Sequence, residues 1–214
     1  MPKNGRLLLS GQLDLAHIGP ADVTLACDAA ALAAVQAGLD LDVAVGDFDS
    51  VTAEELSIIA QAAQNLVTLP VAKDDTDAQA AVLWFFQHYP TGQLTIYGAF
   101  GGRLDHALAN IFLPSHPEIA PFMEQIVLRD AWQELTYVPQ GRHIVQQTPG
   151  MTGLAFVQEG QGQLGISGAR FDLTGDNYFQ RKVYSSNNFL TGPVTVTVPD
   201  GYVICLQTRE RRRQ

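Results

Sequence analysis

The stretch DVAVGDFDSV, residues 42–51, joins a short apolar run to two aspartates, Asp47 and Asp49. The run is almost continuously apolar, as expected of a strand with both faces covered by other parts of the fold. Carboxylates are poor strand formers and repel one another at short range, so a pair of them needs a reason to stand here. The stretch predicts a buried strand that surfaces in a functional loop.

Outward from this stretch, short apolar runs alternate with helical patterns. The strand-like runs lie at 6–11, 22–28, 42–47, 66–70, 93–99 and 125–130, and the helical patterns lie at 30–38, 52–64, 76–89 and 103–112. Strands that alternate with helices of this length are joined by crossovers and run parallel. We therefore predict an α/β N-terminal domain over residues 1–132, with a doubly wound, mostly parallel sheet.

The helical pattern ends near Trp132. Short strand candidates follow at 134–138, 142–147, 153–159, 162–168, 169–173, 194–198 and 202–207. Gly, Pro and Asp separate most of them, at intervals typical of an antiparallel sandwich or barrel. The sequence predicts an all-β C-terminal sandwich domain over residues 133–214.

The composition excludes several classes of protein. A net charge of −9 argues against a nucleic-acid or anionic-membrane partner, because phosphate binding needs a basic face. No apolar stretch approaches the roughly 20 residues that span a bilayer. Two cysteines are too few for a disulfide framework, and the first leucine run is too short for a secretory signal, so we expect a cytoplasmic protein.

Aspartates gather where strands of the first half end. Asp28 follows one strand, Asp47 and Asp49 follow the next, and KDDTD (73–77) follows the fourth. Ligands of open α/β sheets bind beyond the carboxyl ends of the strands. A single aspartate there is more often a turn former or helix cap, but aspartates from three loops on one edge suit Mg²⁺ bound together with phosphates.

The segment GAFGGRLDH, residues 98–106, follows another strand and opens a helix. Glycines there expose backbone N–H groups beside a helix N-terminus, which favours a phosphate, and Arg103 would add a bidentate grip. His106 has two interpretations, a ligand contact or an inert hydrogen-bonded histidine. The sequence has no G-x-x-x-x-G-K-[ST] motif, so a P-loop is excluded.

Four segments, in this order and spacing, resemble the thiamine pyrophosphokinase family. They are CDAA (27–30), VGDFDSV (45–51), KDDTDAQAA (73–81) and GAFGGRLDHALAN (98–110). Residues 184–206 are similar to the thiamine-binding domain of that family. The resemblance implies an α/β domain followed by a β-sandwich, a homodimer, and transfer of the β,γ-diphosphate of ATP to thiamine with Mg²⁺, which gives thiamine diphosphate and AMP.

The resemblance also implies roles for individual residues. Metal binding falls to Asp47, Asp49 and Asp77, and catalysis to the same three with Asp105. The residues implied for the nucleotide and its phosphates are Asp28, Thr76, Gly101, Gly102, Arg103 and His106. Asp105, Ser186 and Asn187 are implied for thiamine, the last two in a loop, although Ser and Asn also favour a plain hairpin turn there.

One departure from the family pattern concerns Ala29 and Ala30, which stand where the family carries two glycines. Two added methyl groups would narrow the approach of a phosphate or ribose to the backbone. Two other functions therefore stay open. One is diphosphate transfer to a different heterocyclic alcohol, such as a hydroxymethylpterin. The other is a non-catalytic sensor of thiamine or nucleotide.

Overall fold

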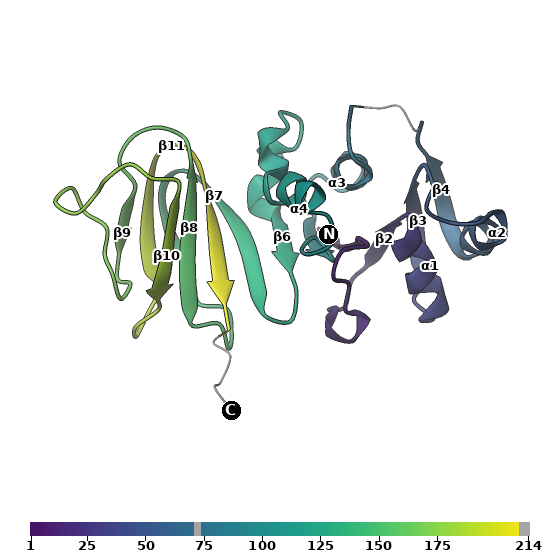
Figure 1. Cartoon of the computed structure of the whole chain (residues 1–214), viewed down its shortest axis with the longest axis horizontal. Helices are drawn as coiled ribbons and strands as arrows, with labels where there is room; N and C mark the ends of the chain where they lie inside the picture. The colour runs from purple at the N-terminus through teal and green to yellow at the C-terminus, as the bar shows by residue number, and fades with distance from the viewer. Residues whose placement is uncertain (71–73, 210–214) are drawn as a thin grey trace. The chain divides into compact units, whose positions relative to one another are not determined.

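The computed structural model describes residues 1–70 and 74–209 of the chain. The chain divides into two compact units, Met1–Ala131 and Trp132–Gln214 (Figure 1). The first is built from strands and helices, and the second from strands. Within the described residues, no helix has the length and apolar character needed to cross a membrane.

The first unit is built on a parallel sheet. Its strands are β1 (Asn4–Leu8), β2 (Val23–Cys27), β3 (Leu41–Gly46), β4 (Ala63–Thr68), β5 (Gln93–Tyr97) and β6 (Ile126–Arg129). They lie in the order β6-β5-β1-β2-β3-β4, and all neighbouring pairs are parallel. From β1 the chain adds β2, β3 and β4 on one side of β1, and it then returns to add β5 and β6 on the other side of β1. The place between β1 and β5 is therefore the switch point at which such sheets bind ligands.

Among the described residues of this unit, four α-helices accompany the sheet: α1 (Ala29–Gln36), α2 (Ala53–Ala62), α3 (Asp77–His88) and α4 (Leu104–Ile111). Leu8 of β1 lies in one core cluster with residues of α1 and α2. Gly5 of the same strand lies against the Phe85 ring of α3, so close that any Cβ there would overlap the ring. Positions 5 and 8 point to opposite faces of a strand, so α1 and α3 cover opposite faces. The predicted doubly wound α/β fold is confirmed.

Short 3₁₀ turns complete the first unit: η1 (Leu15–His17), η2 (Leu113–Ser115) and η3 (Ala120–Gln125). The predicted helix over 52–64 is too long, because α2 ends at Ala62. The predicted strand over 66–70 starts too late, because β4 begins at the next residue, Ala63. Ala63 already pairs with Leu41 of β3. Since β4 is the edge strand and much of it is exposed, it lacks the apolar run by which the inner strands are found.

The second unit is antiparallel throughout the described residues. Its strands are β7 (Gln133–Val145), β8 (Gly153–Glu159), β9 (Gly165–Ser167), β10 (Val183–Asn188) and β11 (Val194–Thr208). They lie in the order β10-β8-β11-β7, and β9 pairs with β11. One face buries Phe156, Leu164 and Val196 in a common core. The predicted strand-rich C-terminal region is confirmed.

Two long strands of this unit replace four predicted short ones. The runs 134–138 and 142–147 belong mostly to β7, and 194–198 and 202–207 both lie in β11. The residues between the runs lie within the paired strands, because Pro139 is opposite Tyr202, Gly141 is opposite Val198, and residues 199–201 form an irregularity between these two pairs. They shift the register without ending the strands. The first half of β11 is thereby free to pair with β9 and the second half with β8.

Candidate active site

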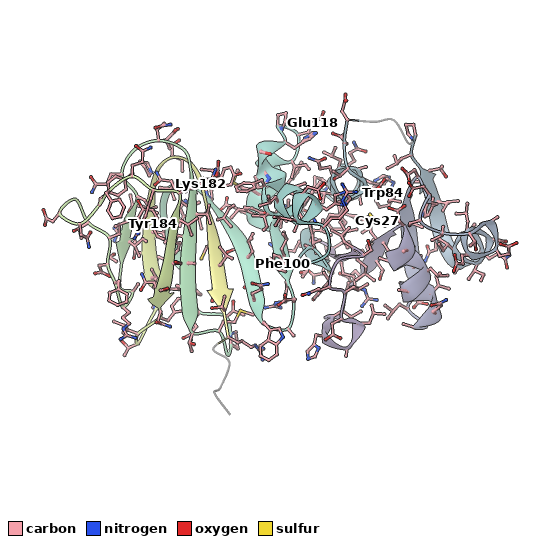
Figure 2. All side chains as sticks on the ribbon, viewed as in Figure 1. Cys27, Trp84, Phe100, Glu118, Lys182 and Tyr184 are labelled. Atoms are coloured by element: carbon pink, nitrogen blue, oxygen red, sulfur yellow. The ribbon has the colours of Figure 1, made fainter. Side chains whose placement is uncertain are left out.

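A pocket of about 480 Å³ lies at the carboxyl ends of the strands of the first unit. Its walls come from the segments that follow β1, β2, β3 and β5 and from the first turns of α3 and α4. Figure 2 labels Cys27, which ends β2, and Phe100, which lies in the segment after β5. Of the residues predicted for the site, the lining includes Asp28, Asp47, Asp49, Thr76, Asp77, Gly101, Gly102, Arg103 and His106.

Three of the pocket carboxylates converge. Asp28, Asp47 and Asp77 each offer one oxygen, and these oxygens all lie within 4.8 Å of one another. Asp28 follows β2, Asp47 follows β3, and Asp77 is the first residue of α3. Asp49 lines the same pocket without belonging to this group, and Asp28 joins two of the three aspartates that the resemblance implies for the metal.

An unusual backbone conformation places Asp28 in the group. Its φ is 47°, in the region that favours glycine, and its side chain does not cap the helix α1 that it precedes. The carboxylate points to the turn after β3 instead, where the Phe48 N–H donates to Oδ1 over 3.1 Å. A Cβ at Gly46 would overlap this carboxylate. The glycine that ends β3 therefore makes room for a carboxylate from β2.

The turn after β3 separates Asp47 from Asp49. Phe48 between them has a φ of 57° and a ring only 4% exposed, in the core with α1 and α2. The Asp49 N–H donates to Asp47 Oδ1 over 3.2 Å, which stabilises the turn. Strained backbone conformations such as these persist where the surrounding structure enforces them, commonly at functional sites. The buried ring holds the two aspartates at the strand end.

Asp77 reaches the group from the start of α3. The Thr76 hydroxyl accepts from the Gln79 N–H and the Gln79 side chain accepts from the Thr76 N–H, a capping box that fixes the first turn. The structure thus gives Thr76 a capping role beside the pocket. The helix dipole stabilises an acidic side chain in this first turn.

The electrostatics of the group suit a divalent cation. Partial burial, followed by the charge of Asp77, raises the pKa of Asp28 to about 7, and Asp47 adds to the rise. Crowded carboxylates repel one another unless a proton or a cation lies among them. Hard oxygen ligands in this number are those that Mg²⁺ prefers. The residues present therefore fit Mg²⁺.

The raised pKa predicts how the metal-free protein responds to pH. Because the folded protein holds this proton more tightly than the unfolded chain, the Asp28 carboxyl should stabilise the fold fully below its ordinary pKa of 3.8. This stabilisation should be lost as the pH rises through about 7. Melting temperature in EDTA should fall from about pH 5 to about pH 8, more steeply in wild type than in Asp28→Asn, whose amide oxygen still accepts from Phe48. Addition of Mg²⁺ at about pH 8 should raise the melting temperature of the wild-type protein again. Equal slopes for the two proteins would contradict the assignment.

A glycine segment forms the opposite wall. Gly98, Gly101 and Gly102 have φ values of 71°, 79° and 67°, which only glycine adopts readily. Gly98 also lies against the Leu9 carbonyl, where a Cβ would overlap the oxygen. The Gly11 N–H donates to Gly98 O over 3.1 Å, which ties the segment after β5 to the one after β1. The bare backbone of residues 98–102 borders the pocket at the switch point.

Helix α4 supports this segment. Asn110 of α4 is 8% exposed, and its Nδ2 donates to Ala99 O over 3.1 Å. This hydrogen bond ties the glycine segment to α4. His106 lies four residues earlier, is exposed and lines the pocket. His106 and Asn110 both line the pocket, so they lie on the face of α4 that is turned to it.

Arg103 and Asp105 contact each other in a bidentate pair. Arg103 Nη2 and Nε donate to the two Asp105 oxygens over 2.6 and 3.2 Å, which lowers the pKa of Asp105 to about 2. Both side chains are well exposed. Arg103 lines the pocket, whereas Asp105 is absent from the described lining and from the three-carboxylate group. The catalytic and thiamine-binding roles that the resemblance implies for Asp105 stay predictions.

Ser186 and Asn187 lie in the second unit, within β10. The prediction of a loop or hairpin turn here is wrong, because the segment pairs with β8 on either side of an irregularity between Tyr184 and Asn187. Ser186 is exposed and has a φ of 64°. Asn187 is 8% exposed, accepts from the Phe171 N–H over 2.9 Å and donates to the Phe171 carbonyl over 2.7 Å. Asn187 therefore anchors the segment around Phe171.

The two alanines after Asp28 begin helix α1. Ala30 is 2% exposed and packs in the core with Ala34 and Leu41, and neither Ala29 nor Ala30 is among the described residues that line the pocket. Their methyl groups serve the helix and its packing. The expected narrowing of the pocket by Ala29 and Ala30 is not what the structure shows.

Replacing Ala30 by glycine should therefore affect stability rather than catalysis. Glycine costs roughly 1 kcal/mol within a helix, and the loss of a buried methyl adds a similar amount, so we expect destabilisation of roughly 1–2 kcal/mol. The KM for nucleotide should stay within about twofold of wild type. Ala33→Gly, within α1 and outside the described pocket lining, is the matched control for stability. A nucleotide KM that falls severalfold in Ala30→Gly would show that the methyl group obstructs the ligand.

The sequence did not point to Leu9, Ser10 and Gly11, which follow β1 and line the pocket, or to Ser50. Gly11, which ends the predicted strand over residues 6–11, was a signal. Its meaning depends on the strand order, because only the placement of β5 beside β1 makes this segment a neighbour of residues 98–102.

The fold is thus an α/β sheet whose switch point carries a pocket lined by three convergent carboxylates and a glycine segment. The comparisons with known proteins name the family. Residues 17–121 match the model of the thiamin pyrophosphokinase catalytic domain. The chain belongs to the thiamin pyrophosphokinase family.

Individual relatives agree with this assignment. A thiamine pyrophosphokinase of Bacillus subtilis (strain 168) is 30% identical over 132 residues, which span 61% of this chain and 60% of that curated relative. The crystal structure of a thiamin pyrophosphokinase family protein from Enterococcus faecalis has a TM-score of 0.89 and 30% identity, and covers 97% of this chain and 100% of its own. A protein from Lactobacillus plantarum has a TM-score of 0.85 and 28% identity, with 97% and 99% covered.

Proposed function

We propose that this protein is a thiamine pyrophosphokinase, which transfers the β,γ-diphosphate of ATP to the hydroxyl of thiamine and releases AMP. The observation that carries the proposal is the three-carboxylate group opposite the glycine segment, in one pocket at the switch point of the sheet. Membership of the family and the Bacillus subtilis relative support this reaction.

The carboxylates Asp28, Asp47 and Asp77 would hold Mg²⁺, and Asp49 would lie beside them in the same pocket. When bound, Mg²⁺ would neutralise charge on the phosphate oxygens and so favour displacement at phosphorus. Asp49 lines the pocket but does not belong to the three-carboxylate group. We therefore assign to Asp49 the role of the base that accepts the proton of the acceptor hydroxyl.

The phosphates would contact the opposite wall. Gly101 and Gly102 would offer backbone N–H groups, and His106 would donate from its ring. Arg103 would grip phosphate oxygens bidentately. Its pair with Asp105 is well exposed, and exposed ion pairs contribute little to stability, so Arg103 can exchange that carboxylate for a phosphate. Asp105 would then accept hydrogen bonds from the second substrate.

The second unit would bind thiamine. We assign the direct contact to Ser186, which is exposed on β10. Asn187 would act through the Phe171 segment that its side chain anchors. Thiamine is cationic and aromatic, and it suits an acidic protein. We further infer a homodimer from the family, and a cytoplasmic location that agrees with two buried cysteines outside any disulfide.

Competition between acceptors tests the substrate. The protein is incubated with ATP, Mg²⁺ and equimolar thiamine and hydroxymethylpterin, and the diphosphorylated products are separated. We expect thiamine diphosphate alone. A pterin diphosphate as the main product would keep the mechanism and overturn the substrate. Tight binding of thiamine with no product from either alcohol would support a sensor.

A further inference from the structure

The ring of His116 contacts the connection that leads to Asp77. His116 lies between η2 and η3, and its Nε2 is 3.2 Å from Asp75 Oδ1. The Glu118 N–H donates to His116 Nδ1, also over 3.2 Å. Because Nδ1 accepts a hydrogen bond, the proton of the neutral ring is on Nε2, and Nε2–H donates to Asp75.

His116 itself is firmly held. Its N–H donates to Leu113 O over 3.1 Å, and its carbonyl accepts from Ile119 N and Ala120 N over 3.0 and 2.9 Å. Leu113 and Ile119 are fully buried. The imidazole is 17% exposed, so it occupies a fixed place on a packed segment.

The contact reaches the start of α3. Asp75 is followed by the cap residue Thr76 and then by Asp77 of the three-carboxylate group. Farther along the helix, Phe86 stacks on Phe122 of η3 with ring centroids 4.4 Å apart. The segment that carries His116 thus contacts α3 near the C-terminal end of the helix, and it also contacts the connection that precedes the first turn of α3.

We infer that His116 is a positioning residue for the proposed metal site: by holding Asp75, it fixes the path on which Asp77 enters the pocket. This inference rests on the proposed function, since it concerns the same carboxylates. Residues that orient metal ligands from outside influence metal affinity, and a partly exposed hydrogen bond near the ligand should influence it modestly.

Two substitutions separate the two hydrogen bonds of the ring. In His116→Gln, the side-chain amide nitrogen takes the place of Nε2 and still donates to Asp75, while the bond from Glu118 is lost. In His116→Asn, the amide oxygen takes the place of Nδ1 and still accepts from Glu118, while the bond to Asp75 is lost. Direct titration with Mn²⁺ in the absence of substrates measures metal binding, and thermal unfolding without metal measures stability.

We expect His116→Asn to bind Mn²⁺ about three- to tenfold more weakly than wild type, and His116→Gln to stay within about twofold. Asp75→Ala should weaken binding as His116→Asn does, and the double variant should add little. Wild-type Mn²⁺ affinity in His116→Asn, or equal losses in both histidine variants, would overturn the inference. Absence of Mn²⁺ binding by wild type, or binding that survives Asp47→Asn, would overturn the metal site itself and the inference with it.

Discussion

Asp47→Asn should lower the rate of thiamine diphosphate formation at least about 100-fold, with the fold intact. The substitution keeps the size of the side chain and the acceptor for the Asp49 N–H, and it removes one of three charges that converge within 4.8 Å. Direct titration should show weaker Mn²⁺ binding in parallel with the loss of rate. Relief of repulsion should leave the metal-free variant as stable as wild type or more so.

Asp40→Asn is the matched control for this variant. Asp40 is exposed and lies just before β3, at the opposite end of the strand from Asp47. The same charge is removed from the same strand, so bulk electrostatics change equally while the pocket stays unaltered. Activity near wild type in Asp47→Asn, or an equal loss in Asp40→Asn, would contradict the assignment of the metal site.

Gly98→Ala should prevent stable folding or destabilise the protein by at least about 3 kcal/mol. The residue has a φ of 71°, and its Cβ would overlap the carbonyl oxygen of Leu9. That backbone cannot move freely, because the Leu9 N–H is bonded to Tyr97 O over 2.9 Å and the Gly11 N–H to Gly98 O. Urea unfolding of the purified variant measures the loss, and its soluble yield shows whether it folds.

Gly102→Ala separates the collision from the dihedral strain. Gly102 has a similar φ of 67°, but the nearest atom to its Cβ would be Gly11 Cα at 3.7 Å. The control should therefore cost only roughly 1–2 kcal/mol, the penalty for a left-handed residue with a side chain. Equal destabilisation of the two variants would mean that the close contact between the segments after β1 and β5 adds nothing to the cost of the Gly98 substitution.

The fold was readable from the sequence where both faces of a strand are buried. The inner strand β3 (Leu41–Gly46) stands out as an apolar run, and its end is marked by Asp47. Edge strand β4 was misplaced because its exposed residues follow no apolar pattern. Strand β10 was missed because its centre, Ser186 and Asn187, has the composition of a turn, and pairing with β8 overrides that local preference.

The part of the candidate site that could be predicted from the sequence follows from one rule: parallel strands bring their carboxyl ends to one edge of the sheet. That rule predicts that the segments with Asp28, Asp47 and Asp77 meet, and the structure places all three in one pocket. It cannot decide which side chains converge, because this depends on the backbone at Asp28 and Phe48, where φ is positive at non-glycine residues. It also cannot reach His116, whose link to Asp75 spans 41 residues of chain.

The nucleotide product tests the central claim most directly. Wild-type protein is incubated with ATP, Mg²⁺ and thiamine, and the nucleotides and thiamine esters are separated and quantified. Transfer of a diphosphate predicts AMP and thiamine diphosphate in equal amounts, abolished by EDTA because the acidic pocket needs a cation to hold a polyphosphate. ADP with thiamine monophosphate would show attack at the γ-phosphorus and contradict the account.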